Sequence, residues 1–232
     1  RMFFIGQMIR LILTCRMINL YNRDCMEALK EFKDNQFDLA IVDPPYGINA
    51  DNKNNGKNSD RHEKTSKAKI NTYKKTNWDN AIPTNEYFKE LKRVSKRQVV
   101  WGANYFNLQG GMLYWDKKVT MPTYSQGELA WLSWLNKVDF VSIAWHGMIQ
   151  HDMKNKETRI HPTQKPVKLY EWLLMNYAKE GDKILDTHLG SGSIALACHN
   201  LKYDLTGYEL DTEYFEGANK RLKQHQSQLR MY

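Results

Sequence analysis

The chain has 232 residues, 41% of them hydrophobic, which is enough for one domain with a substantial core. Its formal net charge of +8 suits a polyanionic partner, and no segment is long and apolar enough to predict a membrane span. The three cysteines, Cys15, Cys25 and Cys198, are scattered and lack paired metal spacing. This usage indicates free thiols in a reducing, cytoplasmic compartment.

Residues 1–16 are interpreted separately from the rest of the chain. They are mostly apolar but interrupted by Arg10, and they lack a clean small-residue cleavage site. The folded pattern begins at Ile18, directly after Met17. We therefore expect residues 1–16 to be an upstream or non-native extension and residues 17–232 to form a single domain. An N-terminal helix packed on that domain is the alternative.

The first half of the chain predicts strands at residues 18–22, 37–42, 98–101 and 112–115 and helices at 24–33 and after Pro83. Asp24 caps the first helix, with Glu27 completing an Asp-x-x-Glu capping box. The apolar strand 37–42 ends at two consecutive prolines, in Asp43-Pro44-Pro45-Tyr46. Residues 125–135 are ambiguous, because Ser125-x-x-Glu128 resembles a helix start whereas the aromatic residues suit a strand.

The second half predicts strands at 138–145, 183–186 and 203–209 and helices at 167–178, 192–200 and 211–226. Strands that alternate with helices of this length indicate a parallel sheet with right-handed crossovers. The expected fold is therefore α/β, with a doubly wound, Rossmann-like and mostly parallel seven-stranded sheet.

Two glycines follow the predicted strand 183–186, in the sequence Asp186-Thr-His-Leu-Gly190-Ser191-Gly192. Such a strand, glycine turn and helix let a ligand approach the backbone at a helix N-terminus. Glu209 ends the next strand, where a carboxylate can bind both hydroxyls of a ribose. The pattern predicts a nucleoside-binding half-site. A dinucleotide site is disfavoured because Ser193, Ile194 and Ala195 follow Gly192 where the third glycine of Gly-x-Gly-x-x-Gly would be expected.

Asp43-Pro44-Pro45-Tyr46 lies at the carboxyl end of a predicted strand, where open α/β sheets bind ligands. Its chemistry fits methylation of an amino group whose lone pair is delocalised into a base. The Asp43 side chain and the Pro44 carbonyl can accept the amino hydrogens, and Asp43 can oppose the positive charge that develops on nitrogen. Tyr46 can stack on an extruded base. A proline turn without function is the alternative.

These motifs resemble the permuted, or β-group, DNA amino-methyltransferases that modify adenine N6 or cytosine N4. In that group the catalytic motif precedes the cofactor motif, as it does here, and the resemblance covers residues 18–226. Further matching pieces are Asn22-Arg-Asp24-Cys25, Trp101-Gly-Ala-Asn104, Tyr114-Trp-Asp-Lys117 and His161-Pro-Thr163-Gln-Lys165-Pro166. The resemblance implies a circularly permuted methyltransferase fold with S-adenosylmethionine as the cofactor.

The resemblance also assigns roles to residues. It implies Asp43, Pro44, Pro45 and Tyr46 as the catalytic motif, and places Asp24 and Cys25 near the cofactor's adenine and Glu209 on its ribose. The cofactor's methionine end is expected near Thr163, Lys165, Pro166, Asp186, Gly190, Ser191 and Gly192, and Asp43 is expected to border the cofactor.

One position departs from the family, which usually has proline and then an aromatic residue after the motif's aspartate. Here Thr187 and His188 stand in those places. His188 either fills the aromatic's place beside the cofactor or is a satisfied structural histidine. No metal site is expected, since His146, His151, His161 and His188 lack zinc-ligand spacing.

A strongly basic segment follows the catalytic motif. Residues 51–77 carry eight Lys and Arg against three acids, and this balance suits phosphate contacts. The family's recognition insertion would fall at residues 147–160, where Lys154, Lys156 and Arg159 are the main basic side chains. Because that segment is short, we expect residues 47–77 to share DNA binding. A solvated spacer without a partner is the alternative for this loop.

The function expected from the sequence is adenine-N6 methylation of double-stranded DNA, since cytosine-N4 enzymes of the group more often carry serine at the position of Asp43. Cytosine-N4 methylation, methylation of RNA or of a protein amide, a catalytically silent DNA-binding protein and a dinucleotide-dependent oxidoreductase are the alternatives. A homodimer and a restriction endonuclease partner stay open, as does the DNA recognition sequence.

Overall fold

The computed structural model describes residues 17–50, 78–120 and 125–228, so the basic segment 51–77 and residues 1–16 lie outside the described residues. One sheet contains β1 (Ile18–Asn22), β2 (Leu39–Val42), β3 (Gln98–Trp101), β4 (Gly111–Asp116), β5 (Gly127–Leu132), β6 (Val138–Ser142), β9 (Lys183–Asp186) and β10 (Asp204–Glu209). A separate two-stranded ribbon pairs β7 (Trp145–His146) with β8 (Ile149–Gln150).

The helices are α2 (Cys25–Glu31), α4 (Asn85–Val94), α5 (Val167–Tyr177), α6 (Ser193–Leu201) and α7 (Thr212–Gln228), with a single 3₁₀ turn, η1 (Ala103–Tyr105). Asp24 caps α2 as expected, its carboxylate accepting the backbone N–H of Met26 at 2.6 Å. The helix ends at Glu31, two residues before the predicted end, and Glu27 lies 3.5 Å from Arg23 in an ion pair.

The strand order is β1-β10-β9-β2-β3-β5-β4-β6. The pairs from β1 to β3 are parallel, β5 is antiparallel to both β3 and β4, and β6 is parallel to β4. The predicted α/β class with a mostly parallel sheet is confirmed. The predicted count of seven strands is wrong for the described residues, because the ambiguous segment 125–135 forms β5 between β3 and β4 and makes an eighth.

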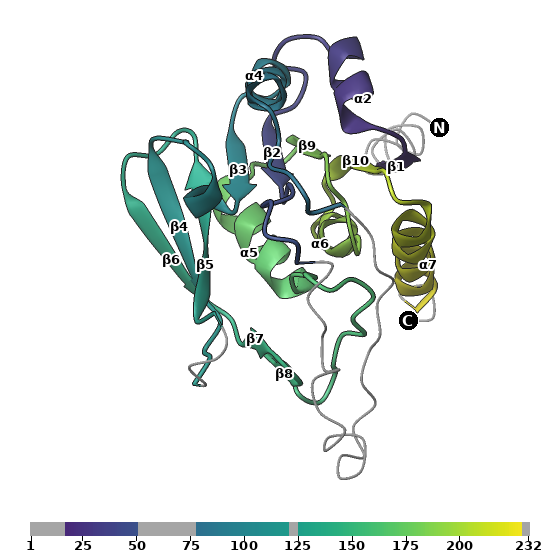
Figure 1. The fold of residues 1–232 in the computed structure, drawn as a ribbon. Helices are drawn as coiled ribbons and strands as arrows, with labels where there is room; N and C mark the ends of the chain where they lie inside the picture. The colour runs from purple at the N-terminus through teal and green to yellow at the C-terminus, as the bar shows by residue number, and fades with distance from the viewer. Residues whose placement is uncertain (1–16, 51–77, 121–124, 229–232) are drawn as a thin grey trace, which may run out of the picture.

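Helices cover both faces of the sheet. In β2, Leu39 and Ile41 pack on one face with α5, α6 and α7, whereas Ala40 and Val42 pack on the other with α2 and α4. Figure 1 shows α2 and α4 on one side of the strands and α5 and α6 on the other. Because all four residues of β2 are buried, the strand reads as a continuous apolar run, as expected for a parallel strand covered on both faces.

The strand order reverses between β9 and β2, which are neighbours in the sheet. From β9 the chain continues through α6 to β10 on one side, and from β2 it continues through α4 to β3 on the other. A crevice forms at the carboxyl ends of strands where such a reversal occurs. Asp186 ends β9 and Asp43 follows β2 directly, so both aspartates lie at this crevice. Among the described residues, no helix is long and apolar enough to cross a membrane.

Candidate active site

A cavity of about 940 Å³ opens at the strand reversal. Its lining includes ten of the residues expected from the sequence, namely Asp24, Cys25, Asp43, Pro45, Thr163, Lys165, His188, Gly190, Ser191 and Glu209. The remaining five, Pro44, Tyr46, Pro166, Asp186 and Gly192, do not line the cavity, but each is the chain neighbour of a residue that does. Segments from five separate parts of the chain therefore meet around one space.

Asp43 is held from two sides. The Tyr46 hydroxyl donates a hydrogen bond to Asp43 Oδ1, and the Lys165 ammonium donates to Asp43 Oδ2 at 2.5 Å and to the Tyr46 hydroxyl at 3.2 Å. Burial raises the pKa of Asp43, and Lys165 opposes that rise. The carboxylate is thus fixed in orientation, while each of its oxygens still has a further lone pair to accept a ligand hydrogen.

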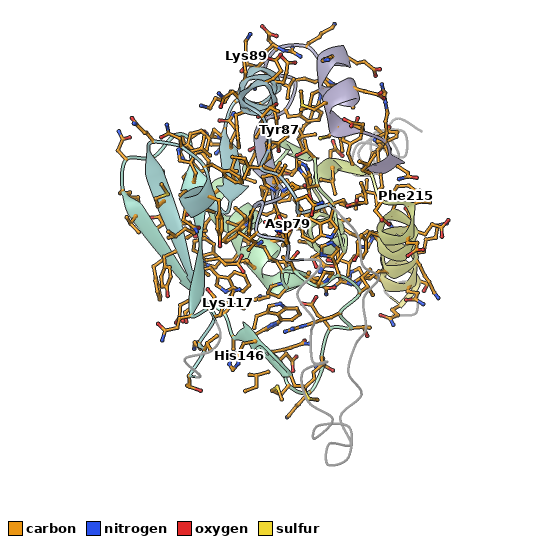
Figure 2. All side chains as sticks on the ribbon, in the orientation of Figure 1. Asp79, Tyr87, Lys89, Lys117, His146 and Phe215 are labelled. Atoms are coloured by element: carbon orange, nitrogen blue, oxygen red, sulfur yellow. The ribbon has the colours of Figure 1, made fainter. Side chains whose placement is uncertain are left out.

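The backbone after the proline pair is fixed by Asp79. This buried carboxylate accepts the backbone N–H groups of Tyr46 at 2.6 Å, Gly47 at 2.9 Å and Ala50 at 2.8 Å. The Asp79 carbonyl accepts the N–H of Asn49 at 3.1 Å. Figure 2 shows Asp79 near the middle of the molecule. Four backbone donors that follow the strand are therefore satisfied by one residue.

The Tyr46 ring stacks on Tyr105, with 4.9 Å between the ring centroids and 14° between the planes. Gly102 contacts the same ring so closely that an added Cβ atom would overlap it. Tyr105 is 39% exposed, so the stack reaches the molecular surface. The arrangement leaves Tyr46 with a fixed ring and with its hydroxyl directed at Asp43.

Lys165 is shared between two carboxylates. Besides Asp43, it forms an ion pair with Glu128 at 3.1 Å, and Glu128 in turn pairs with Lys117. Burial alone would lower the pKa of Lys165, but Asp43 and Glu128 raise it above its ordinary value. Although burial opposes ionisation of Glu128, Lys165 and Lys117 lower its pKa to about 2. Lys165 and Glu128 therefore favour their charged forms, whereas burial raises the pKa of Asp43.

Glu209 also lines the cavity, but it ends β10, whereas the proline motif follows β2. Its carboxylate accepts the backbone N–H of Gly190 at 2.7 Å and of Asp211 at 2.9 Å. Burial raises its pKa, and these two hydrogen bonds oppose the rise. Gly190 lines the cavity, whereas a Cβ atom on Gly192 would lie 2.9 Å from Ala218 Cβ. The first glycine thus borders ligand space, and the second allows α6 and α7 to pack closely.

Asp186 is buried beside the cavity, and His188, two residues later, lies on the cavity wall. Burial raises the pKa of Asp186 to about 8, even though its carboxylate accepts the backbone N–H of His188 at 3.0 Å. Burial lowers the pKa of His188 to about 4. The His188 imidazole hydrogen-bonds Thr187 Oγ1 at 2.9 Å, and Thr187 bonds the Tyr87 hydroxyl at 2.7 Å. His188 is therefore a neutral, hydrogen-bonded ring that also lines the cavity.

The hexapeptide His161 to Pro166 forms another wall. The His161 ring lies 5.3 Å from the Trp78 ring and 4.3 Å from the Tyr214 ring, and Thr163 Oγ1 lies 3.1 Å from His161 Nδ1. Burial lowers the pKa of His161 to about 3. Pro166 is the N-cap residue of α5. The segment therefore presents Thr163 and Lys165 to the cavity and then begins a buried helix.

The segment 147–160 is tied to the domain through Glu157. The Glu157 carboxylate binds the Arg221 guanidinium at 2.5 Å and accepts the backbone N–H of Val167 at 2.9 Å. Arg221 also donates to the Ser191 carbonyl at 3.1 Å and to Ser193 Oγ at 2.8 Å. These contacts connect the β7–β8 region to the glycine turn beside the cavity.

Near the start of α2, Asp24 uses its side chain as a helix cap and Cys25 follows it. Burial and the neighbouring Asp24 raise the pKa of the Cys25 thiol to about 12. Cys25 is therefore a neutral thiol on the cavity wall rather than a reactive thiolate.

Several residues of the site were missed by the sequence interpretation. Asp79 and Tyr105 carry no local motif, and their roles depend on contacts with the proline motif. Glu128 was considered only as a residue of a possible capping box, yet it lies on β5 and pairs with Lys165. The only sequence signal available for it was a charged residue beside the apolar run 129–132.

Comparisons with known proteins agree with this geometry. Residues 69–220 match the family model N6_N4_Mtase, described as DNA methylase, and this range is more than half of the chain. The type II methyltransferase M2.DpnII of Streptococcus pneumoniae is 24% identical over 239 residues, covering 88% of this chain and 89% of that protein. The type II methyltransferase M.HpaI of Haemophilus parainfluenzae is 41% identical over 68 residues, which cover 29% of this chain and 22% of that protein.

Solved structures share the fold. The M1.HpyAVI–SAM complex superposes with a TM-score of 0.56 at 22% identity, covering 89% of this chain and 100% of that one. The PvuII DNA methyltransferase, cytosine-N4-specific, superposes with a TM-score of 0.55 at 14% identity, covering 88% of this chain and 86% of that one. At these identities the similarity demonstrates a common architecture.

Proposed function

The chain belongs to the N6/N4 family of DNA methylases, and from that premise we propose that it transfers a methyl group from S-adenosylmethionine to the N6 amino group of adenine in double-stranded DNA. The observation that carries the proposal is the position of Asp43 and Glu209. Both line one cavity at the strand reversal, Asp43 after β2 and Glu209 at the end of β10. The carboxylate proposed for catalysis and the carboxylate proposed to bind the ribose therefore share one ligand space.

The residues present fit S-adenosylmethionine. The cavity volume of about 940 Å³ is within the range of small-molecule sites. Glu209 is oriented by the N–H groups of Gly190 and Asp211, so its remaining lone pairs can accept hydroxyls of a ribose. Asp24 and Cys25 would border the adenine, and Thr163, Lys165, His188 and Ser191 would border the methionine portion. When bound, the cofactor supplies an activated methyl group on a sulfonium.

Asp43 would act as a hydrogen-bond acceptor and counter-charge. An exocyclic amino nitrogen is a poor nucleophile because its lone pair is delocalised into the base. Hydrogen bonds from the amino group to Asp43 and to the Pro44 carbonyl would localise that lone pair. The positive charge that develops on the nitrogen would then face a carboxylate already oriented by Tyr46 and Lys165. The proton can leave after methyl transfer, so no general base need act first.

The target base must leave the duplex to reach Asp43, so we infer base flipping with aromatic stacking at Tyr46. Tyr46 already stacks on Tyr105, and that aromatic pair reaches the surface. DNA binding is assigned to residues 47–77, which include the basic segment 51–77, and to the recognition segment 147–160. Both belong to a single proposed domain of residues 17–232. Ala50 and Trp78, the described residues on either side of the basic segment 51–77, both lie next to Asp79, Ala50 through a hydrogen bond of 2.8 Å and Trp78 in the sequence.

The proposal is tested by label transfer. The native protein is incubated with S-adenosylmethionine carrying a labelled methyl group and, in separate reactions, with mixed double-stranded DNA, RNA or protein. The nucleic acids are then digested to nucleosides. We expect label in N6-methyldeoxyadenosine from the native protein and none from Asp43→Asn. The matched control is Asp38→Asn, which changes a carboxylate just before the amino end of the same strand β2 and should leave transfer intact.

The identity of the labelled nucleoside separates the candidates. Label in N4-methyldeoxycytidine would replace adenine by cytosine as the target. Transfer to RNA or protein but not to DNA would reject DNA as the substrate, and no transfer to any of them would reject the enzyme assignment.

The share of the basic segment in DNA binding is tested by replacing residues 51–77 with a short Gly-Ser linker. The segment carries a net charge of +5 by sequence, so its removal should weaken binding and flatten the dependence of affinity on salt concentration. Unchanged affinity and salt dependence would assign the phosphate contacts elsewhere.

A further inference from the structure

Four buried or half-buried side chains of alternating charge form a series of ion pairs that begins at the proline motif. The order is Asp43, Lys165, Glu128 and Lys117, and each is paired with the next. The Lys165 side chain is 3% exposed, Asp43 is 17%, Glu128 is 25% and Lys117 is 15% exposed. Only Asp43 and Lys165 line the cavity. Glu128 and Lys117 can therefore affect a ligand in the cavity only through Lys165.

The last two members of this order belong to the antiparallel β4–β5 pair, with Glu128 on β5 and Lys117 directly after β4. Glu128 on β5 lies opposite Trp115 on β4, and the backbone N–H of Lys117 bonds the Gln126 carbonyl at 2.9 Å. Figure 2 shows Lys117 at the end of these strands. This strand register fixes the position of Glu128 independently of the loops that carry Asp43 and Lys165.

The surroundings of the two ammonium groups are aromatic. Lys165 Nζ lies 5.2 Å from the centroid of the Trp101 ring, and Lys117 Nζ lies 5.0 Å from that of Trp115. Both rings are buried. Aromatic faces attract cations, but they cannot replace the hydrogen-bond acceptors that an ammonium loses on burial. Lys165 donates hydrogen bonds to Asp43 and to the Tyr46 hydroxyl, and Glu128 adds the negative charge of an ion pair at 3.1 Å.

We propose that Glu128 is a positioning residue for methyl transfer, which holds Lys165 against the Asp43 carboxylate and separates the Lys165 and Lys117 charges. This role rests on the proposed function of Asp43. Without the Glu128 charge, two ammonium groups lose their common partner and repel each other. Lys165 then keeps Asp43 as its anionic partner but is no longer fixed in orientation, and Asp43 loses the fixed geometry needed to receive the amino group.

The series of ion pairs also makes a prediction about pH. The groups that act on Asp43 are Lys165, Tyr46 and Glu128, and Asp186, Tyr87 and Tyr170 are coupled to it as well. The negative charge of Glu128 raises the pKa of Asp43 and that of Lys165. Replacing Glu128 by glutamine removes both effects, so the pKa of each group falls. The acid limb of kcat, set by Asp43, and the alkaline limb, set by Lys165, both move to lower pH.

The test compares Glu128→Gln with Asp182→Asn as the matched control. Asp182 pairs with Arg97 at 2.7 Å, is 14% exposed, and lies at the opposite, amino ends of the strands. We expect Glu128→Gln to lower kcat at least tenfold, to leave the Kd of S-adenosylmethionine within about twofold, and to shift both pH limbs downward. Glu128→Gln combined with Lys117→Met removes the repulsion and should recover part of kcat. Asp182→Asn should lower only stability.

Two results would overturn the proposal: a kcat and pH profile of Glu128→Gln equal to the native values, or a loss of kcat with both limbs unmoved, which indicates a purely structural role. A readout without turnover keeps this test separate from the proposed function. Carbon-13 NMR titration of the Asp43 carboxyl, assigned with Asp43→Asn, should give a lower pKa in Glu128→Gln or, if that variant is unstable, in the double variant. An unchanged pKa rejects the positioning role even if the native protein methylates no DNA.

Discussion

Asp79 accepts a hydrogen bond of 2.6 Å from the backbone N–H of Tyr46, a residue 33 positions earlier in the chain. The same carboxylate receives the N–H groups of Gly47 and Ala50. A buried carboxylate surrounded by backbone donors of one loop is a substitute for the sheet or helix partners that those donors lack. The conformation of the proline motif is therefore set from outside the motif.

Replacing Asp79 by asparagine should weaken this support. The amide keeps one acceptor oxygen for Tyr46 and Gly47, but its NH₂ group would face the N–H of Ala50. A buried donor left unpaired costs about 1–3 kcal/mol, so we expect the free energy of unfolding to fall by roughly that amount and methyl transfer to fall with it. Urea unfolding and label transfer measure both quantities.

The control for Asp79 is Asp152→Asn. Asp152 also accepts two backbone N–H groups, those of Lys154 and Asn155, but in an exposed turn where water can replace them. We expect a much smaller loss of stability there. Equal losses in the two variants would mean that burial of Asp79 adds nothing.

Tyr46→Phe removes the hydroxyl that donates to Asp43 and keeps the ring that stacks on Tyr105. Because that hydrogen bond lowers the pKa of Asp43, its loss should raise the pKa, and activity should disappear at a higher pH during acidification. We expect kcat to fall roughly tenfold, the size expected for a hydrogen bond to a charged group.

The acid limb of Tyr46→Phe should thus move opposite to that of Glu128→Gln. Measuring kcat against pH for the two variants in parallel tests this. If the acid limbs of Tyr46→Phe and Glu128→Gln move in the same direction, the acid limb cannot be assigned to Asp43.

Gly102→Ala should disturb the same tyrosine from another direction. Gly102 has φ of +78°, and an added Cβ atom would overlap the Tyr46 ring. Gly181→Ala is the matched control, because Gly181 has φ of +88° and no atom within 4 Å of an added Cβ. Both variants carry backbone strain of about 1–3 kcal/mol, but only Gly102→Ala should also lose methyl transfer. Activity equal to that of Gly181→Ala would show that the ring relocates without consequence.

His188→Phe should make stability less dependent on pH. Burial lowers the pKa of His188 from 6.5 to about 4, so between these values the unfolded chain binds a proton that the folded protein does not. His188 therefore lowers stability as pH falls from 6.5 to 4, with a slope of up to about 1.4 kcal/mol per pH unit. Phenylalanine cannot titrate, and the slope should decrease accordingly.

Urea unfolding at pH 7, 6, 5 and 4.5 measures the slope for His188→Phe. Exposed His151, replaced by glutamine, is the control and should leave it unchanged. Phenylalanine also loses the hydrogen bond to Thr187, so the absolute stability at pH 7 can fall even though its pH dependence weakens. An unaltered slope would place the titration on other groups such as His161.

The sequence by itself determined the α/β class, most strand positions and the positions of the two carboxylates, Asp43 and Glu209. The reason is local: an apolar run of strand length followed by Pro44 and Pro45 must end there, and a strand, glycine turn and helix is encoded within a dozen residues. Since parallel strands place their carboxyl ends at one edge of a sheet, both motifs lie at a common crevice.

Only the tertiary structure decided what surrounds Asp43. Lys165 reaches it from 122 residues away, and Glu128 lies on a strand whose sequence fitted a helix start equally well. The periodicity of β5 is ambiguous because its identity depends on pairing with β3 and β4 rather than on local propensity. Long-range ion pairs depend on which segments pack together, and that packing is not encoded within any single window of the chain.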